Sequence, residues 1–237
     1  MHPFSLVHLG DQAVTLSLGN DLNPVHHQRI VAVRRWLQDH PFPGLLDIVI
    51  AYSSLTVVYD ATPLNRLVGP NSCVRYVEDV LRQAITSAES VSDMAGEGAE
   101  MIIPVCYDEA FAPDLHVVCR ISGLSPDDIV QIHTSRVYTV YMVGFLPGFP
   151  YLAEVDQRLR VGRKDTPVKV EAGSVGLAGV QTGIYPMTSP GGWQIIGRTP
   201  VSLFDANRQP CAILQPGDKV RFVSINRSEF DNVRASS

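Results

Sequence analysis

The sequence predicts an α+β N-terminal domain followed by a closed or nearly closed β-barrel domain. Residues 4–88 alternate between short apolar runs and segments of helical periodicity, which is typical of a small α+β layer. Residues 89–100 are small, polar and aperiodic, which indicates a linker. Beyond residue 168 the chain breaks into short strand-like runs with glycine turns, as expected for a barrel. The expected parts are residues 1–90, a linker at 91–99, the barrel at 100–228 and a C-terminal tail at 229–237.

The first part contains two expected strand pairs and two expected helices. The first strand pair is expected at Phe4–Leu9 and Ala13–Leu18. A helix follows that ends near His40, because Asn23 is a good N-cap residue and Pro24 suits the first helical position. The remaining elements of this part are a second strand pair and a second helix, expected at Leu46–Tyr52, Leu55–Tyr59 and Ser72–Ala88.

The second part opens with an expected strand at Met101–Val105 and a helical region at Asp114–Ile121. Ser125 and the proline after it form a helix start, and this helix carries His133 near its end. A strand at Tyr138–Val143 precedes a glycine- and proline-rich segment. Six further short strands complete the expected barrel: Ser174–Ala178, Gln181–Tyr185, Trp193–Ile196, Val201–Phe204, Cys211–Leu214 and Val220–Ile225.

Composition narrows the class of protein. The chain of 237 residues has 19 basic and 24 acidic residues, a net charge of −5, and no run of basic residues longer than a pair. This argues against nucleic acid as a partner. No apolar stretch approaches the roughly 20 residues that cross a bilayer, and the first residues lack signal-peptide character. The four cysteines form no Cys-x-x-Cys pair, so we expect reduced thiols in the cytoplasm and no membrane partner.

The common catalytic motifs are missing from the sequence. It contains no P-loop, no dinucleotide-binding glycine motif, no His-Glu-x-x-His and no nucleophile elbow. Histidines and cysteines do not cluster, so no metal site is expected. What needs explanation instead is glycine: 7 of the 18 glycines lie between Gly173 and Gly197. Glycine at this density lets the backbone turn sharply or approach another surface closely, as barrel corners and ligand-facing surfaces both require.

Five segments of the second part combine glycine and proline with aromatic and polar residues. They are Gly144-Phe145-x-Pro147-Gly148-Phe149-Pro150-Tyr151-Leu152, Gly173-Ser174-Val175, Gln181-Thr182-Gly183-Ile184-Tyr185-Pro186, Ser189-Pro190-Gly191-Gly192-Trp193 and Ile196-Gly197-Arg198-Thr199-Pro200. In this order the segments resemble the allophanate-hydrolase subunit 1 family. That family includes the B-type subunits of 5-oxoprolinase and the Kip-type inhibitors of a sporulation histidine kinase. The sequence departs from the family pattern at Ala112, Glu154-Val155 and Glu171, which lie at expected turn edges.

The resemblance implies a cyclophilin-like β-barrel after the α+β domain, and a component of an ATP-dependent 5-oxoprolinase. Such a component would form a composite site with a second, carboxyltransferase-like partner, the C-type subunit of 5-oxoprolinase. A third, lactam-handling subunit would complete the complex, which would bind ATP, alone or with magnesium. A relaxed lactam is a poor electrophile, so phosphorylating its oxygen would open the ring carbon to attack. Catalysis of phosphoryl transfer is mostly positioning and charge stabilisation.

Two alternatives stay open beside the 5-oxoprolinase. The chain could instead inhibit a sensor histidine kinase by docking on its helical bundle, or act as subunit 1 of an allophanate hydrolase. The polar residues His133, Gln181 and Arg198 favour an enzyme, because docking alone would not specially require them. We expect the isolated chain to be inactive, because its site would be only half-built.

Two residues are candidates for catalysis. His133 has the residue type of a general acid or base, although a packed, carbonyl-capping histidine is the alternative. Arg198 could bind a phosphate or carboxylate through two hydrogen bonds, although an ion pair with Asp205 is the alternative. The candidates for contact with substrate or nucleotide could equally be core or strand residues. They are Gly144, Phe145, Pro147, Gly148, Phe149, Tyr151, Gly173, Ser174, Gln181, Thr182, Tyr185, Gly191, Gly192 and Trp193.

Overall fold

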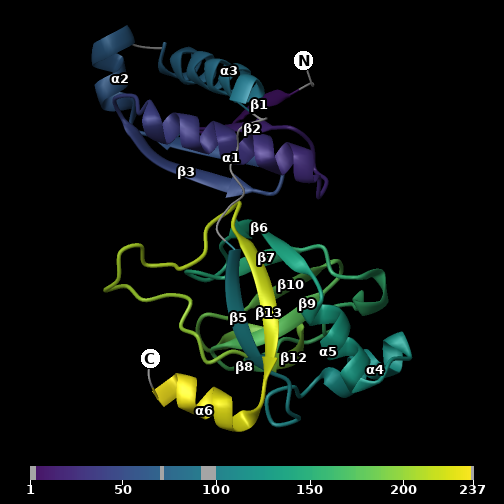
Figure 1. Cartoon of the computed structure of the whole chain (residues 1–237). Helices are drawn as coiled ribbons and strands as arrows, with labels where there is room; N and C mark the ends of the chain where they lie inside the picture. The colour runs from purple at the N-terminus through teal and green to yellow at the C-terminus, as the bar shows by residue number, and fades with distance from the viewer. Residues whose placement is uncertain (1–3, 70–71, 92–99, 236–237) are drawn as a thin grey trace. The chain divides into compact units, whose positions relative to one another are not determined.

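The computed structural model describes residues 4–69, 72–91 and 100–235 (Figure 1). The chain divides into two compact units, residues 1–96 and 97–237. Most of the linker expected at 91–99 lies outside the described residues. Each unit has its own hydrophobic core.

The N-terminal unit contains a four-stranded antiparallel sheet with the order β1-β2-β4-β3. Alternate residues of the two central strands, such as Leu16 and Leu55, are fully buried, which is the pattern of a sheet covered on one face. The strands are β1 (Ser5–His8), β2 (Ala13–Ser17), β3 (Leu45–Ala51) and β4 (Ser54–Tyr59).

The described residues of this unit form three helices: α1 (Pro24–Asp39), α2 (Ala61–Val68) and α3 (Cys73–Val91). The side chain of Asn23 accepts hydrogen bonds from the first turn of α1, which confirms the predicted cap. The short α2 helix was not expected from the sequence. Buried side chains of α1 and α3, including Ile30, Val33 and Leu81, form one core with the sheet.

The second unit contains a closed barrel with the strand order β10-β7-β6-β13-β5-β12-β9, which confirms the predicted barrel. Neighbouring strands are antiparallel except β5 and β13, which pair in parallel from Glu100–Lys219 to Cys106–Ile225. The strands are β5 (Glu100–Cys106), β6 (Val137–Val143), β7 (Pro150–Ala153), β9 (Ser174–Ala178), β10 (Gln181–Ile184), β12 (Gln194–Arg198) and β13 (Lys219–Ile225). A separate two-stranded antiparallel sheet consists of β8 (Val168–Val170) and β11 (Ser189–Gly191).

The prediction of two strands, at Val201–Phe204 and Cys211–Leu214, is wrong. Residues 201–204 and 211–214 form a long loop held by a single bridge between Phe204 and Ala212, together with backbone hydrogen bonds. Leu203 and Leu214 are apolar because they are buried in the barrel core, and this pattern resembles a strand in the sequence. The strand that takes part in the barrel instead is β7, which lies inside the glycine- and proline-rich segment.

Three helices and one short 3₁₀ helix accompany the barrel: α4 (Leu115–Ser122), α5 (Pro126–Thr134), α6 (Arg227–Ala235) and η2 (Gln157–Leu159). The α5 helix begins with the predicted Ser125 cap, which forms a reciprocal capping box with Asp128. The α6 helix occupies the region that was expected to be a tail. Phe230 anchors it, because this side chain is only 1% exposed and packs against Phe111 with ring centroids 4.4 Å apart.

Close packing explains one of the barrel glycines. A Cβ atom at Gly197 on β12 would lie 2.7 Å from Cγ1 of Val105 and 3.0 Å from the carbonyl oxygen of Cys106. Both distances are far below ordinary van der Waals contact, so β12 can lie against β5 here only without a side chain.

We therefore expect Gly197→Ala to lower the free energy of unfolding by about 1–3 kcal/mol, the usual cost of overpacking a core. Urea unfolding measures this change. Gly162→Ala is the matched control, because a Cβ at Gly162 would meet no atom within 4 Å. Equal stability of the two variants would contradict this explanation of Gly197.

Candidate functional site

A cavity of about 340 Å³ lies beside the barrel, between the β8 strand, the ends of β9 and β12, and the loop before α4. Its size falls at the small end of the range for ligand sites. Of the residues predicted to contact a ligand, Ser174 and Arg198 line this cavity. The other residues that matter for its chemistry are Phe111, Asp114, Lys164, Lys169 and Glu171.

Arg198, at the end of β12, is held in place by a main-chain contact. Its Nε donates a hydrogen bond of 2.7 Å to the carbonyl oxygen of Ala172. Gly173 makes this approach possible, because it has a φ of +83° and a Cβ there would lie 2.3 Å from the carbonyl oxygen of Thr199. Burial lowers the pKa of Arg198, and the nearby Arg234 lowers it further. An arginine remains charged under such a shift, so the cavity contains a fixed positive charge.

The terminal nitrogens of Arg198 remain available to a ligand. Within the part of the chain that the structure describes, no carboxylate lies within ion-pair distance of Arg198. The alternative pair with Asp205 does not form, and the Asp205 carboxylate instead accepts from the backbone N–H of Asn207. A partly buried guanidinium without an acidic partner suits an anionic ligand.

The two lysines of the cavity are paired with acids. Lys164 Nζ lies 2.5 Å from Asp114 Oδ2, and both side chains are mostly buried. The same oxygen accepts a hydrogen bond of 2.7 Å from the backbone N–H of Ile195, so this pair joins the loop before α4 to β12. Lys169 and Glu171 form an exposed pair at 2.7 Å, and this hydrogen bond lowers the pKa of Glu171.

His133 lies inside the barrel and away from the cavity. Its Nδ1 is 2.8 Å from the Tyr107 hydroxyl, and its Nε2 is 2.9 Å from the Thr182 hydroxyl. The ring stacks on Phe222 with centroids 4.5 Å apart and is 0% exposed. Burial lowers its pKa to about 3, so the ring is neutral at physiological pH. This geometry favours a structural role for both His133 and Thr182, because neither side chain has an open path to a substrate.

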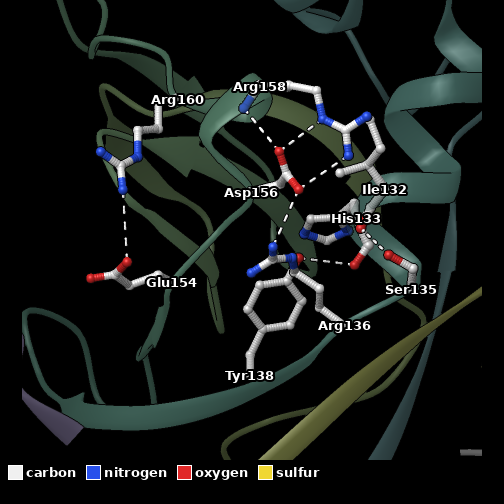
Figure 2. A network of polar contacts seen from close by, with 9 residues as sticks. All are labelled: Ile132, His133, Ser135, Arg136, Tyr138, Glu154, Asp156, Arg158 and Arg160. Carbon is white, nitrogen blue, oxygen red and sulfur yellow. Dashed lines mark hydrogen bonds and ion pairs between the residues drawn. The ribbon is translucent and has the colours of Figure 1, made fainter.

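A polar network beside His133 fixes the end of β7 (Figure 2). The Asp156 carboxylate accepts hydrogen bonds from Arg136, at 3.2 Å, and from the side chain and backbone N–H of Arg158, at 2.9 and 3.0 Å. The hydrogen bond from the Arg158 side chain contributes most to holding the pKa of Asp156 well below its usual value. The Tyr138 hydroxyl donates to the carbonyl oxygen of His133 at 3.0 Å. These groups satisfy one another, so the network stabilises the fold and offers no binding site.

Most of the aromatic residues that were predicted to contact a ligand instead form a second, small hydrophobic core. Phe149, Tyr185 and Trp193 are at most 5% exposed, and the ring of Phe149 meets the other two edge to face. Tyr151 is half-buried against them. A Cβ at Gly191 would lie 2.5 Å from the Tyr185 hydroxyl, so this glycine makes room for the cluster. The cluster includes Val170 and therefore supports β8, which forms one wall of the cavity.

The remaining residues that were predicted to contact a ligand lie outside the cavity. Phe145 is 65% exposed and has a φ of +71°, and Pro147 beside it is exposed. Gly148 packs against Phe204. Gly144, Gln181 and Gly192 are half-buried and do not line the cavity.

Most of the cavity was not predicted from the sequence. The other residues that matter for its chemistry were not among the predicted site residues: Phe111, Asp114, Lys164, Lys169 and Glu171. The described residues contain no group of histidines, cysteines and acids that could hold a metal. Nor do they include a helix with the length and apolar character that crossing a membrane requires.

Comparison with known sequences gives consistent matches. The carboxyltransferase domain, subdomain C and D, matches residues 4–214. The chain is 38% identical to the B-type subunit of 5-oxoprolinase from Bacillus subtilis (strain 168), over 99% of this chain and 98% of the relative. It is 37% identical to the same subunit from Escherichia coli O157:H7, over 91% of this chain and 93% of the relative.

Solved structures show the same fold. The crystal structure of the protein TTHA0988 superposes with a TM-score of 0.75 at 36% identity, covering 91% of this chain but only 40% of that one. The urea carboxylase of Kluyveromyces lactis superposes with a TM-score of 0.70 at 16% identity, covering 98% of this chain and 23% of that one. The second match shows the fold alone. Both chains continue well beyond the part that matches this protein.

The burial of His133 predicts a pH dependence of stability. In the unfolded chain its pKa is near 6.5 and in the folded chain about 3, so below pH 6.5 the unfolded state binds a proton that the folded state does not. Stability is therefore lost as the pH falls from 6.5 towards 3. Between pH 7 and pH 5 this residue should cost about 2 kcal/mol.

Urea unfolding at pH 7 and pH 5 of the wild type and of His133→Gln measures this cost. The glutamine side chain does not titrate, so the variant should lose about 2 kcal/mol less than the wild type between the two pH values. Equal losses in the two proteins would show that His133 is not buried as a neutral ring.

Proposed function

This chain belongs to the family of carboxyltransferase domains, subdomain C and D, and we propose that it is the B-type subunit of an ATP-dependent 5-oxoprolinase. The observation that carries the proposal is the 38% identity to the corresponding subunit from Bacillus subtilis, which extends over 99% of this chain. In this function the chain helps to convert 5-oxoproline into glutamate as part of a complex with other subunits.

The cavity of Arg198 is this chain's contribution to a composite active site. Its guanidinium is oriented by the carbonyl oxygen of Ala172 and has terminal nitrogens left for an anionic group. Opening a lactam with ATP places negative charge on transferring oxygens, and a fixed positive charge stabilises such a transition state. The site is half-built in the isolated chain, which we expect to be inactive. A carboxyltransferase-like C-type subunit and a third, lactam-handling subunit complete it, and ATP, alone or with magnesium, binds to the assembled complex.

Support for a second subunit comes from the length of the structural relatives. This chain matches 40% of TTHA0988 and 23% of the urea carboxylase of Kluyveromyces lactis, so both relatives carry this fold together with further domains. We infer that separate subunits supply comparable neighbours here. The match to the urea amidolyase of Saccharomyces cerevisiae is weaker, at 29% identity over 49% of this chain, and no feature of the cavity favours allophanate hydrolysis or kinase inhibition.

The finer description of the fold is also part of the proposal. We infer that the barrel is cyclophilin-like, with α4 and α5 as accompanying helices, and that residues 1–90 form an independent α+β domain. The four-stranded sheet shares a core of its own with α1 and α3, which supports this division. We expect the complex to work in the cytoplasm.

The role of Arg198 is tested in the reconstituted complex. The chain is mixed with its two partner proteins, and ATP-dependent conversion of 5-oxoproline to glutamate is measured. We expect Arg198→Ala to lower kcat/KM by at least tenfold, because one charge-assisted contact to the transition state is lost. The matched control is Arg160→Ala, which removes the same charge from an exposed pair with Glu154 in the same unit (Figure 2).

The expected control result is turnover within twofold of the wild type. Equal activity of the Arg198→Ala complex, with assembly shown by size-exclusion chromatography, would contradict the role of Arg198. An assembled wild-type complex that does not turn over 5-oxoproline would contradict the proposed function itself.

The same assay decides between a structural and a catalytic His133. At a temperature where the variant is fully folded, we expect His133→Gln to keep turnover within about threefold of the wild type, because the ring does not touch the cavity. A loss of 100-fold or more with unchanged assembly is the magnitude expected for a general acid or base, and would restore the catalytic role predicted from the sequence.

A further inference from the structure

The C-terminal helix α6 brings two more arginines to the edge of the Arg198 cavity. Phe111, which lines the cavity, packs on Phe230 of α6 with ring centroids 4.4 Å apart. The guanidinium of Arg227 lies 4.3 Å from the centroid of the Phe111 ring, and that of Arg198 lies 5.8 Å from the same centroid. Two cations therefore share one aromatic side chain, an arrangement that orients each of them.

The positive charge at this edge is poorly compensated. Arg227 pairs with Asp231 at 3.3 Å, but both side chains are more than half exposed, and such a pair contributes little. Arg234, in the last turn of α6, is exposed and has no carboxylate within ion-pair distance in the described ranges. Burial lowers the pKa of Arg198 most and Arg234 lowers it next, whereas Glu171 raises it and Arg227 lowers it by less. Arg227 and Arg234 thus both act on Arg198 beside the cavity, and Glu171 offsets part of their effect.

We propose that this cavity, together with Arg227 and Arg234 of α6, binds the phosphate group of a small phosphorylated molecule. This inference rests on the proposed function in placing the site within the reaction of the complex. Guanidinium groups bind phosphate oxygens through paired hydrogen bonds, and Arg198 has both terminal nitrogens available. A phosphate group carries close to two negative charges at neutral pH, which matches a cluster of cations better than a single carboxylate does.

The size of the cavity selects among phosphate-bearing molecules. A volume of about 340 Å³ suits a small organic phosphate, such as a phosphorylated acid or lactam, better than a whole nucleotide. Lys164 forms an ion pair with Asp114, and Lys169 forms one with Glu171. Because these lysines are already paired, the arginines are the groups that bind the phosphate.

Calorimetric titration of the isolated full-length chain tests this proposal without turnover. The probes are acetyl phosphate, inorganic phosphate, ATP and acetate, all at one low ionic strength. We expect acetyl phosphate and inorganic phosphate to bind at least tenfold more tightly than acetate. ATP binding that is tighter than acetyl phosphate binding and equally sensitive to the variants would overturn the choice of a small molecule and identify a nucleotide as the source of the phosphate group.

Three variants locate the binding site. We expect Arg198→Ala to weaken acetyl phosphate binding at least tenfold. Arg234→Ala, at an exposed position where folding is not at risk, should weaken it about threefold or more. Arg160→Ala is the matched control for net charge and should change the Kd less than twofold. Circular dichroism confirms the fold of each variant.

Either of two further results would overturn the proposal. One is acetate binding as tightly as the phosphates, which would assign the cavity to a carboxylate. The other is phosphate binding that is absent, or that weakens equally in Arg160→Ala and Arg234→Ala, since this would be unspecific attraction. Failure of phosphate binding in a chain that still supports 5-oxoproline turnover in the complex would remove this inference and leave the proposed function standing.

Discussion

The parallel pairing of β5 with β13 is the constraint on which the surroundings of Arg198 depend. Because the two strands run in the same direction from Glu100–Lys219 to Cys106–Ile225, their carboxyl ends meet at one edge (Figure 1). The segment after β5 carries Phe111, and the segment after β13 is α6. Arg198 joins them there because it pairs with Cys106 across β12 and β5. These two strand pairings thus bring together three parts of the chain that are about 30 to 120 residues apart.

The barrel unit separates two kinds of polar residue. His133 and Thr182 form a hydrogen bond with each other inside the barrel. A charged imidazole ring would lose its hydration there, so burial lowers the pKa of His133 and keeps the ring neutral. Arg198 stays charged at the rim, where a main-chain carbonyl orients it and no acid among the described residues neutralises it. The buried, neutral His133 therefore stabilises the packing of the core, whereas the charged Arg198 at the rim is available to bind a ligand. We therefore propose that this subunit contributes to the reaction at the rim of the barrel.

Elements whose signals are local could be predicted well from the sequence. The Asn23 and Ser125 caps and the glycine-cornered strands were recognised because the determining residues are neighbours in the chain. The loop containing Leu203 was mistaken for a strand, since burial in the core produces the same apolar pattern. The cavity could not be predicted, because Phe111 gains its role only through a pairing with α6 more than 100 residues away. Of the predicted site, Arg198 and Ser174 line the cavity, and Phe149, Tyr185 and Trp193 support its wall.

The decisive measurement is a structure of the assembled complex with a bound phosphorylated analogue of the substrate. We expect a partner subunit to cover the mouth of the Arg198 cavity, and the analogue to lie within hydrogen-bond distance of the Arg198 terminal nitrogens. An analogue bound wholly within the partner, with Arg198 still facing solvent, would show that this chain does not contribute a charged half of a composite site.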